Sequence, residues 1–101
     1  AEDNAKPFEK PVALADAPDY YNIIKDPLDL STIGQRLQRG YYATPQMLLA
    51  DVCRMCDNCK MYNGLDSMYT SYAEKLESFA RARVAEIRVV QAEGDAKRPR
   101  Q

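Results

Sequence analysis

Residues 44–64, TPQMLLADVCRMCDNCKMYNG, carry the clearest structural signal in the chain. Thr44 followed by Pro45 is typical of a helix N-cap and its first position. From there apolar residues recur every three or four positions, as the buried face of an α-helix requires; they are Leu48, Val52, Met55, Cys56, Cys59 and Tyr62. Asn63 and Gly64 favour an end at this point. The stretch therefore predicts a long, half-buried helix.

Two further helices are predicted on either side of this one. Asp29 or Ser31 can cap a helix that runs to about Arg39, with Gly40 just past its end. After a short connection at residues 63–67, a longer pattern reaches toward Gly94. It places eight apolar residues on one face, namely Tyr69, Tyr72, Ala73, Leu76, Phe79, Ala80, Val84 and Ile87. The fold class predicted by these patterns is all-α.

The segment before these helices, from Ala1 to about Leu28, reads as a long ordered loop. Its four prolines, Pro7, Pro11, Pro18 and Pro27, are too close together for any long helix. Pro18 can start one or two turns of helix over residues 19–24, which must end before Pro27 because a residue that precedes proline avoids the helical region.

Length and composition limit the chain to one small domain. Its 101 residues are 46% hydrophobic and 29% charged, which allows a core. The formal net charge of −1 offers no overall attraction to nucleic-acid phosphates. No stretch approaches the roughly 20 apolar residues of a membrane span, and no signal-peptide pattern opens the sequence, so a soluble intracellular domain is expected. We assign residues 1–94 to the domain and residues 95–101 to a basic, disordered tail.

Most kinds of catalytic site are disfavoured. The sequence has no His, the commonest general base and metal ligand, and it has no Gly-rich phosphate loop. Cys53, Cys56 and Cys59 form C-x-x-C-x-x-C. Inside a helix these side chains spread by about 120°, and no fourth soft ligand completes a metal site. We predict free thiols in a reducing compartment, with Cys56 and Cys59 in the core and Cys53 nearer the surface, and neither metal, cofactor nor catalytic residue.

Aromatic residues gather where the predicted helices end. Seven Tyr and no Trp are present, and Tyr20, Tyr21, Tyr62 and Tyr69 all lie at helix ends or junctions. A single Tyr at such a place is usually a half-buried core residue. Asn63 can simply cap its helix, but its amide also offers a donor and an acceptor beside several aromatic walls. Such a site would suit a neutral amide ligand.

A family resemblance follows from these residues. From about Lys6 to Ile87 the chain resembles a bromodomain, and it is most similar to the bromodomains of PCAF-type histone acetyltransferases. The matching motifs, in order, are Pro7-Phe8, Pro11-Val12, Ala17-Pro18-Asp19-Tyr20-Tyr21, Ile24, Asp26-Pro27-Leu28-Asp29-Leu30, Tyr41-Tyr42 and Asn58-Cys59-Lys60-Met61-Tyr62-Asn63. The resemblance implies a left-handed helical bundle with a long loop before the first complete helix.

The resemblance also implies an acetyl-lysine reader of acetylated histone tails. Asn63 would donate its amide hydrogen to the acetyl carbonyl, and the Tyr20 hydroxyl would reach the same oxygen through a water. The remaining pocket residues that the resemblance implies are Tyr62, Tyr69 as gatekeeper, Val12, Phe8, Pro7, Ala17 and Cys59. Asp16, Asp19 and Asp66 would ring the mouth, where they are either solvated loop charges or attract basic residues around the acetylated lysine.

Two departures from the family pattern stand out. The W-P-F shelf of the family reads Lys6-Pro7-Phe8 here, so the aromatic platform is missing. The family begins with a helix before that shelf, whereas Ala1–Ala5 provide about one turn. A missing first helix would leave an apolar groove uncovered and invite a homodimer or a helix from a partner.

Three functions follow for comparison. The first is a nuclear reader of an acetylated histone tail or other acetylated protein within a chromatin-associated complex, acting in transcription regulation, with no membrane attachment and no dedicated nucleic-acid site. The second is a degenerate bromodomain that serves as a protein-interaction or dimerisation module without binding acetyl-lysine. The third, an enzyme, is opposed by the missing His and the lack of a paired nucleophile and base.

Overall fold

The computed structural model describes the chain over residues 6–97, with side chains described as far as Ile87. Within that part the elements are one short 3₁₀ turn and four α-helices, with no strand. In chain order they are η1 (Lys6–Phe8), α2 (Tyr20–Ile23), α3 (Leu30–Gln38), α4 (Pro45–Asn63) and α5 (Met68–Lys97). The predicted all-α class is confirmed.

Helix α4 has the bounds that its sequence predicts. The Thr44 hydroxyl caps it by accepting a hydrogen bond from the Met47 backbone N–H at 3.3 Å, and Pro45 opens its first turn. At the other end Gly64 has a φ of +83°, a left-handed conformation that costs a residue with a Cβ considerably more than glycine. The helix therefore ends at Asn63 because of the residue that follows it.

Helix α3 starts at the first of its two possible caps. The Asp29 carboxylate accepts hydrogen bonds from the backbone N–H groups of Ser31 at 3.0 Å and Thr32 at 3.2 Å. It also accepts bonds from both hydroxyls, with Thr32 Oγ1 at 2.7 Å. Asp29 is thus the N-cap, and Ser31 lies in the first turn.

The long loop predicted from the prolines is joined to α4 by two contacts of Asp26. Arg54 pairs with the Asp26 carboxylate at 2.7 Å, and the Asn58 side chain donates to the Asp26 backbone carbonyl at 2.8 Å. The turn of helix expected over residues 19–24 is present as α2. These contacts hold the α2 end of the loop beside the second half of α4.

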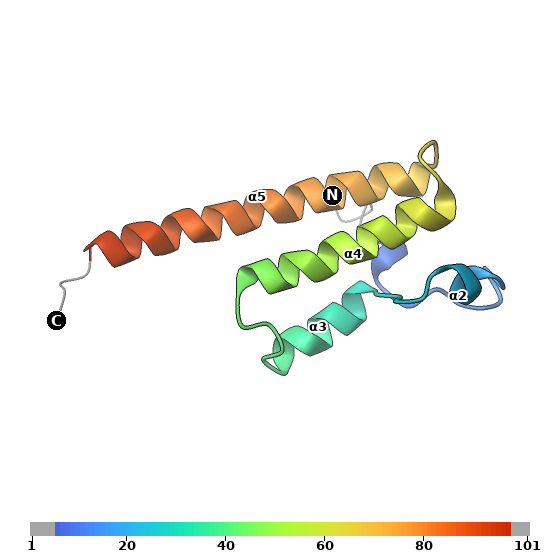
Figure 1. Ribbon diagram of the computed structural model, residues 1–101, viewed down its shortest axis with the longest axis horizontal. Coiled ribbons are helices and arrows are strands. Elements are labelled where there is room, and N and C mark those ends of the chain that lie inside the picture. Colours follow the sequence, from blue (N-terminus) through green and yellow to red (C-terminus); the bar gives the residue numbers. More distant parts are fainter. Residues whose placement is uncertain (1–5, 98–101) are drawn as a thin grey trace.

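The core lies mainly along the seam where α4 and α5 run side by side (Figure 1). Four of the six stripe residues of α4 are buried, namely Val52, Met55, Cys56 and Cys59, and they pack with Phe8, Leu28, Ile33 and Ala73. A smaller cluster of Ala17, Tyr20 and Ile24 holds the loop around α2, with Tyr62 packed against it. The loop thus has a core of its own at the Asn63 end of α4.

Helix α5 is longer and less completely packed than its pattern predicts. It continues through Lys97, three residues past Gly94, and it projects beyond α4 (Figure 1). Ala73 and Val84 are buried, but Phe79 is 62% exposed and Ile87 is 43% exposed. The last four residues of the predicted tail, and the Ala1–Ala5 segment assigned to the first helix, lie outside the described residues.

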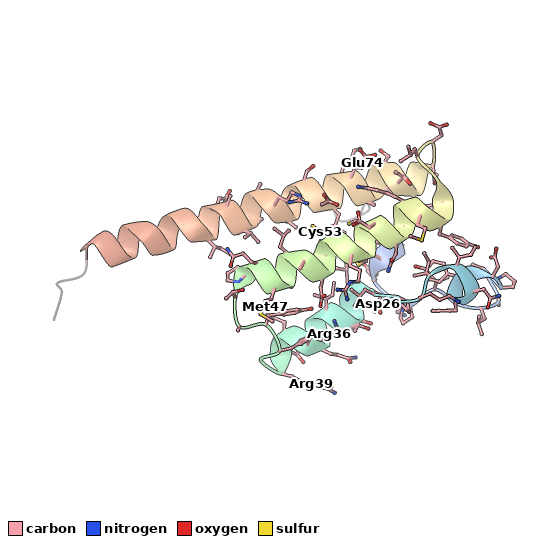
Figure 2. The ribbon with its side chains drawn as sticks, viewed as in Figure 1. Asp26, Arg36, Arg39, Met47, Cys53 and Glu74 are labelled. Carbon is pink, nitrogen blue, oxygen red and sulfur yellow. The ribbon has the colours of Figure 1, made fainter. Side chains whose placement is uncertain are left out.

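The three cysteines are free thiols, as predicted. Cys56 and Cys59 are buried, whereas Cys53 is half-buried on α4 near Arg81 of α5 (Figure 2). Burial raises the pKa of the Cys56 thiol to about 12. The described residues contain no group of three or more side chains suited to hold a metal ion. In that same part of the chain no helix is both long and apolar enough to cross a membrane.

Candidate functional site

An open cavity of about 760 Å³ lies between the long loop and the Asn63 end of α4. One wall is a continuous stretch of the loop from Lys6 to Ala13, joined by Asp16 and Ala17. The other side comes from Tyr20, Leu28, Met55, Cys59, Tyr62, Asn63 and Tyr69. Residues from α2, α4 and α5 therefore meet the loop around one space.

Asn63 stands at the last position of α4 with part of its hydrogen-bonding capacity in use. Its side-chain Nδ2 donates to the Cys59 backbone carbonyl at 3.0 Å and lies 3.5 Å from the Cys59 sulfur. An amide nitrogen carries two hydrogens and the amide oxygen accepts two bonds. Contact with Cys59 therefore orients the amide, and because a thiol sulfur is a weak acceptor, the hydrogen directed at it can turn to a stronger acceptor in the cavity.

Tyr20 supplies the most buried polar group of the cavity wall. Its side chain is 7% exposed, and its ring meets the Tyr62 ring edge-on at a centroid distance of 4.9 Å. Burial, with neighbouring Tyr21, Cys59 and Tyr62, raises the pKa of the Tyr20 hydroxyl above its usual value. The hydroxyl therefore stays protonated at neutral pH and remains a hydrogen-bond donor.

Tyr62 connects the two sides of the cavity. Its hydroxyl donates to the Asp19 carboxylate at 2.7 Å, across 43 residues of sequence. This bond raises the pKa of Tyr62. Asp19 is therefore engaged in holding the loop to the end of α4, and it does not line the cavity.

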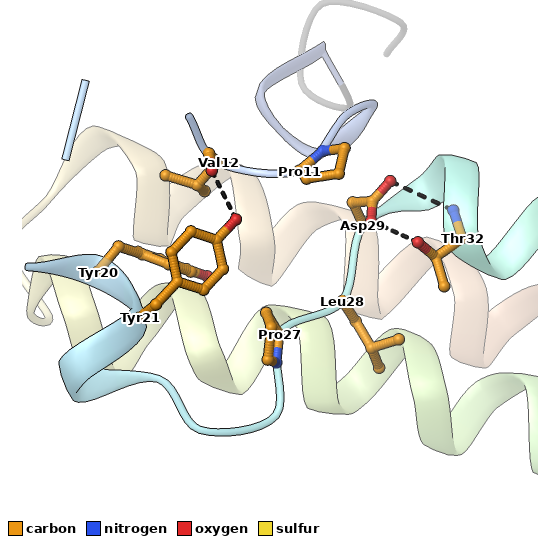
Figure 3. A pocket seen from close by; sticks show the side chains of 8 residues that line it. All are labelled: Pro11, Val12, Tyr20, Tyr21, Pro27, Leu28, Asp29 and Thr32. Carbon is orange, nitrogen blue, oxygen red and sulfur yellow. Dashed lines mark hydrogen bonds between the residues drawn. The ribbon is translucent and has the colours of Figure 1, made fainter. Parts of the chain in front are cut away.

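Val12 is held in the wall by Tyr21, whose hydroxyl donates to the Val12 backbone carbonyl at 2.5 Å (Figure 3). Behind this wall is a second cavity of about 190 Å³, lined by Pro11, Val12, Tyr20, Tyr21, Pro27, Leu28, Asp29 and Thr32. Four of these residues, Pro11, Val12, Tyr20 and Leu28, also line the large cavity. The same side chains thus separate the two cavities, and the Tyr21 hydrogen bond positions the loop at Val12.

The large cavity is lined by four buried apolar side chains of the core, Phe8, Leu28, Met55 and Cys59. Burial raises the pKa of the Cys59 thiol, although the Asn63 amide partly opposes this effect. The thiol is neutral and acts as a small apolar surface. Sequence reasoning missed Leu28 and Met55 as lining residues, although the apolar stripe of residues 44–64 had marked Met55 as a core position.

The structure brings nearly all the residues named from the sequence together. All nine expected pocket residues line the large cavity, namely Pro7, Phe8, Val12, Ala17, Tyr20, Cys59, Tyr62, Asn63 and Tyr69. Of the three acidic residues expected at the mouth, only Asp16 lines it. Asp66 lies in the connection between α4 and α5, outside the lining.

Thr70 fixes that connection and was not singled out from the sequence. The Thr70 side chain is fully buried, and its hydroxyl donates to the Gly64 backbone carbonyl. Gly64 directly follows Asn63, so this bond anchors the chain where it leaves the cavity. No local pattern distinguishes Thr70 from a solvent-facing helical threonine.

The arrangement suits a small neutral group that carries a hydrogen-bond acceptor. Asn63 and Tyr20 are lining residues with uncharged donors near the end of α4, while apolar and aromatic side chains provide most of the surrounding surface. A charged group would lose its hydration against this surface at a large cost in free energy. The carboxylates among the lining residues, Glu9 and Asp16, are both exposed to solvent.

Comparison with known proteins identifies relatives of the chain. Residues 1–75 match the protein family described as Bromodomain. The chain is 48% identical over 83 residues to histone acetyltransferase GCN5 of Oryza sativa subsp. japonica, covering 81% of this chain and 16% of that protein. It is 39% identical over 81 residues to transcription initiation factor TFIID subunit 1 of Drosophila melanogaster, covering 80% and 4%. The chain thus spans less than a fifth of either relative.

A solved structure shares the arrangement of the helices. The crystal structure of CpBRD2 from cryptosporidium superposes with a TM-score of 0.76 at 40% sequence identity, covering 81% of this chain and 77% of that one. The likeness therefore extends over most of the chain.

Proposed function

The chain belongs to the bromodomain family, whose fold is a binding module, and we propose that its large cavity binds acetyl-lysine. The observation that carries the proposal is the position of Asn63 at the last residue of α4, where it lines the cavity and its amide is oriented by the Cys59 carbonyl. The acetyl carbonyl accepts the Asn63 hydrogen that is otherwise directed at the weakly accepting Cys59 sulfur. The Tyr20 hydroxyl reaches the same oxygen through a water.

Discrimination against unmodified lysine rests on charge. Acetylation replaces an ammonium by a neutral amide, whereas the bare ammonium would have to shed water against Phe8, Met55 and Cys59. The neutral Cys59 thiol and the protonated Tyr20 hydroxyl offer that ammonium no opposite charge. The acetylated and unmodified forms of one lysine therefore bind very differently.

Basic residues near the acetylated lysine are attracted by carboxylates at the mouth. Of the three residues considered for this role, Asp16 is exposed and lines the cavity, so the proposal rests mainly on it. Asp19 adds a negative charge while its carboxylate also accepts the Tyr62 bond, and Asp66 adds one from outside the cavity lining. Binding of a basic acetylated peptide should weaken as salt rises, because exposed charges are screened over about 10 Å at 0.1 M salt.

The partner proposed for this site is an acetylated histone tail or another acetylated protein, met in the nucleus. The relatives support this choice, since one is named a histone acetyltransferase and the other a transcription initiation factor. One peptide in one open cavity makes few contacts, so we expect weak single-site binding that is reinforced by attachment to a larger complex. The acetyltransferase activity in the first name is that relative's, and the bromodomain supplies binding.

The test is calorimetric titration of matched acetylated and unmodified histone-tail peptides into the 101-residue chain and its Asn63→Ala variant. We expect only the wild-type chain to bind, and only the acetylated peptide. Asn22→Ala is a matched control, because Asn22 is exposed on α2 and does not line the cavity. Equal binding of both peptides, or full binding by Asn63→Ala, would refute the proposal.

The alternative function is a protein-interaction or dimerisation module that has lost acetyl-lysine binding. The observation that favours it is the exposure of Phe79 and Ile87 on α5. A folded chain that binds no acetylated peptide but self-associates would support this second function.

A further inference from the structure

The large cavity has a cationic stretch in its wall. Lys6 and Lys10 both line it, at the start of η1 and just after its end. Both side chains are exposed, and within the described residues neither forms an ion pair. Glu9 lies between them, so the stretch from residue 6 to residue 10 carries two positive charges and one negative charge.

The exposed carboxylate of the long loop lies elsewhere on the cavity. Asp16 belongs to a turn closed by the Asp16 and Ala17 N–H groups on the Ala13 carbonyl at 3.0 and 3.1 Å. That turn lies near α2, whereas η1 lies beside the middle of α4 (Figure 1). The cavity wall therefore carries its lysines and Asp16 in two separate places.

We propose that Lys6 and Lys10 select an anionic side chain close to the acetylated lysine in the bound segment. This inference rests on the proposed acetyl-lysine binding and adds a sequence preference to it. The family's aromatic shelf residue is replaced by Lys6, so this part of the wall recognises charge in place of apolar surface. The ligand class is a segment in which acetyl-lysine is flanked by a carboxylate or a phosphorylated residue on the η1 side.

The expected size of the preference follows from exposure. Solvent-exposed ion pairs change affinity only modestly, and two of them opposed by Glu9 should give roughly a threefold to tenfold preference at low salt. The preference should shrink as salt rises, since these charges are open to screening. A dianionic phosphate should be preferred over a carboxylate at the same position.

The experiment titrates the 101-residue chain with four acetyl-lysine peptides that differ only in their flanking residues: glutamine, glutamate, phosphoserine and lysine. We expect the glutamate and phosphoserine peptides to bind more tightly than the glutamine peptide. The double variant Lys6→Gln/Lys10→Gln should bind the glutamine, glutamate and phosphoserine peptides with similar affinity, because the preference is lost. The control Lys25→Gln/Lys75→Gln removes the same amount of charge from exposed lysines outside the cavity, and it should retain the preference for an anionic flanking residue.

The outcomes separate the two proposals. If the glutamine peptide binds but glutamate and phosphoserine give no gain, or if Lys6→Gln/Lys10→Gln keeps the gain, the selection by Lys6 and Lys10 is overturned while acetyl-lysine binding stands. If the glutamine peptide fails to bind, or binds equally without its acetyl group, acetyl-lysine binding fails and the charge selection fails with it. A gain with phosphoserine alone assigns the preference to a phosphorylated residue.

Discussion

Thr70 illustrates how one buried polar side chain secures the site from outside it. Its hydroxyl is buried within the first turn of α5 and bonds the Gly64 carbonyl. Loss of the hydrogen bond made by this fully buried hydroxyl costs roughly 1 kcal/mol. Because Gly64 adjoins Asn63, that loss is expected to disturb the position of the Asn63 amide as well.

Replacement of Thr70 tests this role. Thr70→Val removes the donor while keeping the shape, and it should lower the free energy of unfolding by about 1–2 kcal/mol in chemical denaturation. It should also weaken binding of an acetylated peptide. Thr70→Ser keeps the hydroxyl and loses a methyl group, so it should cost about 1 kcal/mol in stability with affinity unchanged. Equal affinity losses in the two variants would show that the hydroxyl is not what positions the site.

Among the helices, α3 and α4 have N-caps that differ in the number of hydrogen bonds they accept. Asp29 is buried and both its carboxylate oxygens accept bonds, from Ser31 and Thr32. Thr44 is exposed and accepts a single long bond of 3.3 Å from Met47. Both caps are recognised from the sequence in the same way, but Asp29 is a buried cap with several hydrogen bonds and Thr44 is an exposed cap with one.

A matched pair of cap substitutions should separate them. Asp29→Ala should lower the free energy of unfolding by about 2 kcal/mol, at the top of the range for N-caps, and Thr44→Ala by about 0.5 kcal/mol. Thermal or urea unfolding of the two variants measures both values. The interpretation fails if Thr44→Ala is the more damaging of the two.

A buried carboxylate joins α3 to α4 and should make stability depend on pH. Asp51, on α4, accepts bonds from Arg36 at 2.7 Å and Tyr42 at 2.6 Å, and Arg36 belongs to α3 (Figure 2). Burial by itself would raise the pKa of Asp51, but these bonds and the nearby arginine charges outweigh it and hold the pKa below its ordinary value. The ionised form is therefore the one that the fold favours.

The sign of the acid dependence follows from that shift. The stabilisation is fully present above the unfolded-state pKa of about 3.9 and is lost as pH falls through the lower folded-state pKa. Denaturation between pH 2 and pH 7 should show this loss in the wild-type chain, and Asp51→Asn should flatten the curve. Asp57→Asn, which removes an exposed carboxylate from the same helix, is the control. An unchanged curve in Asp51→Asn would contradict the assignment.

An alkaline limit should come from the same cluster. Burial and the Asp51 carboxylate raise the pKa of Tyr42 to about 12. Since the unfolded chain loses this proton near pH 10, stability should fall as pH rises from about 10 to 12. Tyr42→Phe should remove this part of the pH dependence, and a curve of unchanged shape would exclude Tyr42 as its source.

At the scale of the whole molecule, the chain is elongated because α5 outruns the helices beside it. Its radius of gyration is 16.2 Å, against about 13 Å for a compact domain of this length. Phe79 and Ile87 remain exposed along α5. The predicted self-association of this 101-residue chain stays a prediction, and it is tested by measuring the oligomeric state.

Sedimentation velocity over a range of concentrations measures the association. If it occurs through α5, the wild-type chain should shift from monomer to dimer with concentration, and Phe79→Ser should remain monomeric. Met61→Ser is a matched control, since Met61 is 66% exposed on the other long helix. A monomer at every concentration would refute the prediction.

The helices and their ends could be predicted from the sequence because their causes are local. The Thr44-Pro45 start, the stop at Gly64 and the apolar stripe of α4 act within a few residues of one another. The face of α5 was less predictable. Its periodicity marks which residues could be buried, but whether Phe79 is covered depends on what packs against it.

The membership of the site was accessible in the sequence through the ordered motifs of the loop and of the Asn58–Asn63 segment. The roles of individual residues within it were less accessible. Asp19 was expected at the mouth, but its bond to Tyr62 spans 43 residues of sequence, and no local sequence pattern around either residue predicts that bond. Met55 was assigned to the buried stripe of α4, and only the folded loop makes it part of a cavity wall.

The sequence by itself determined the all-α class, the free thiols, the bounds of α4 and the residues that gather at its Asn63 end. Hydrophobic period, capping residues and a glycine at positive φ are short-range properties, so they can be read along the chain. Three-dimensional contacts were needed to show that Asp19 holds Tyr62 and that Lys6 and Lys10 share a cavity with Asn63. These depend on contacts between distant segments, which burial and loop path create when the chain folds.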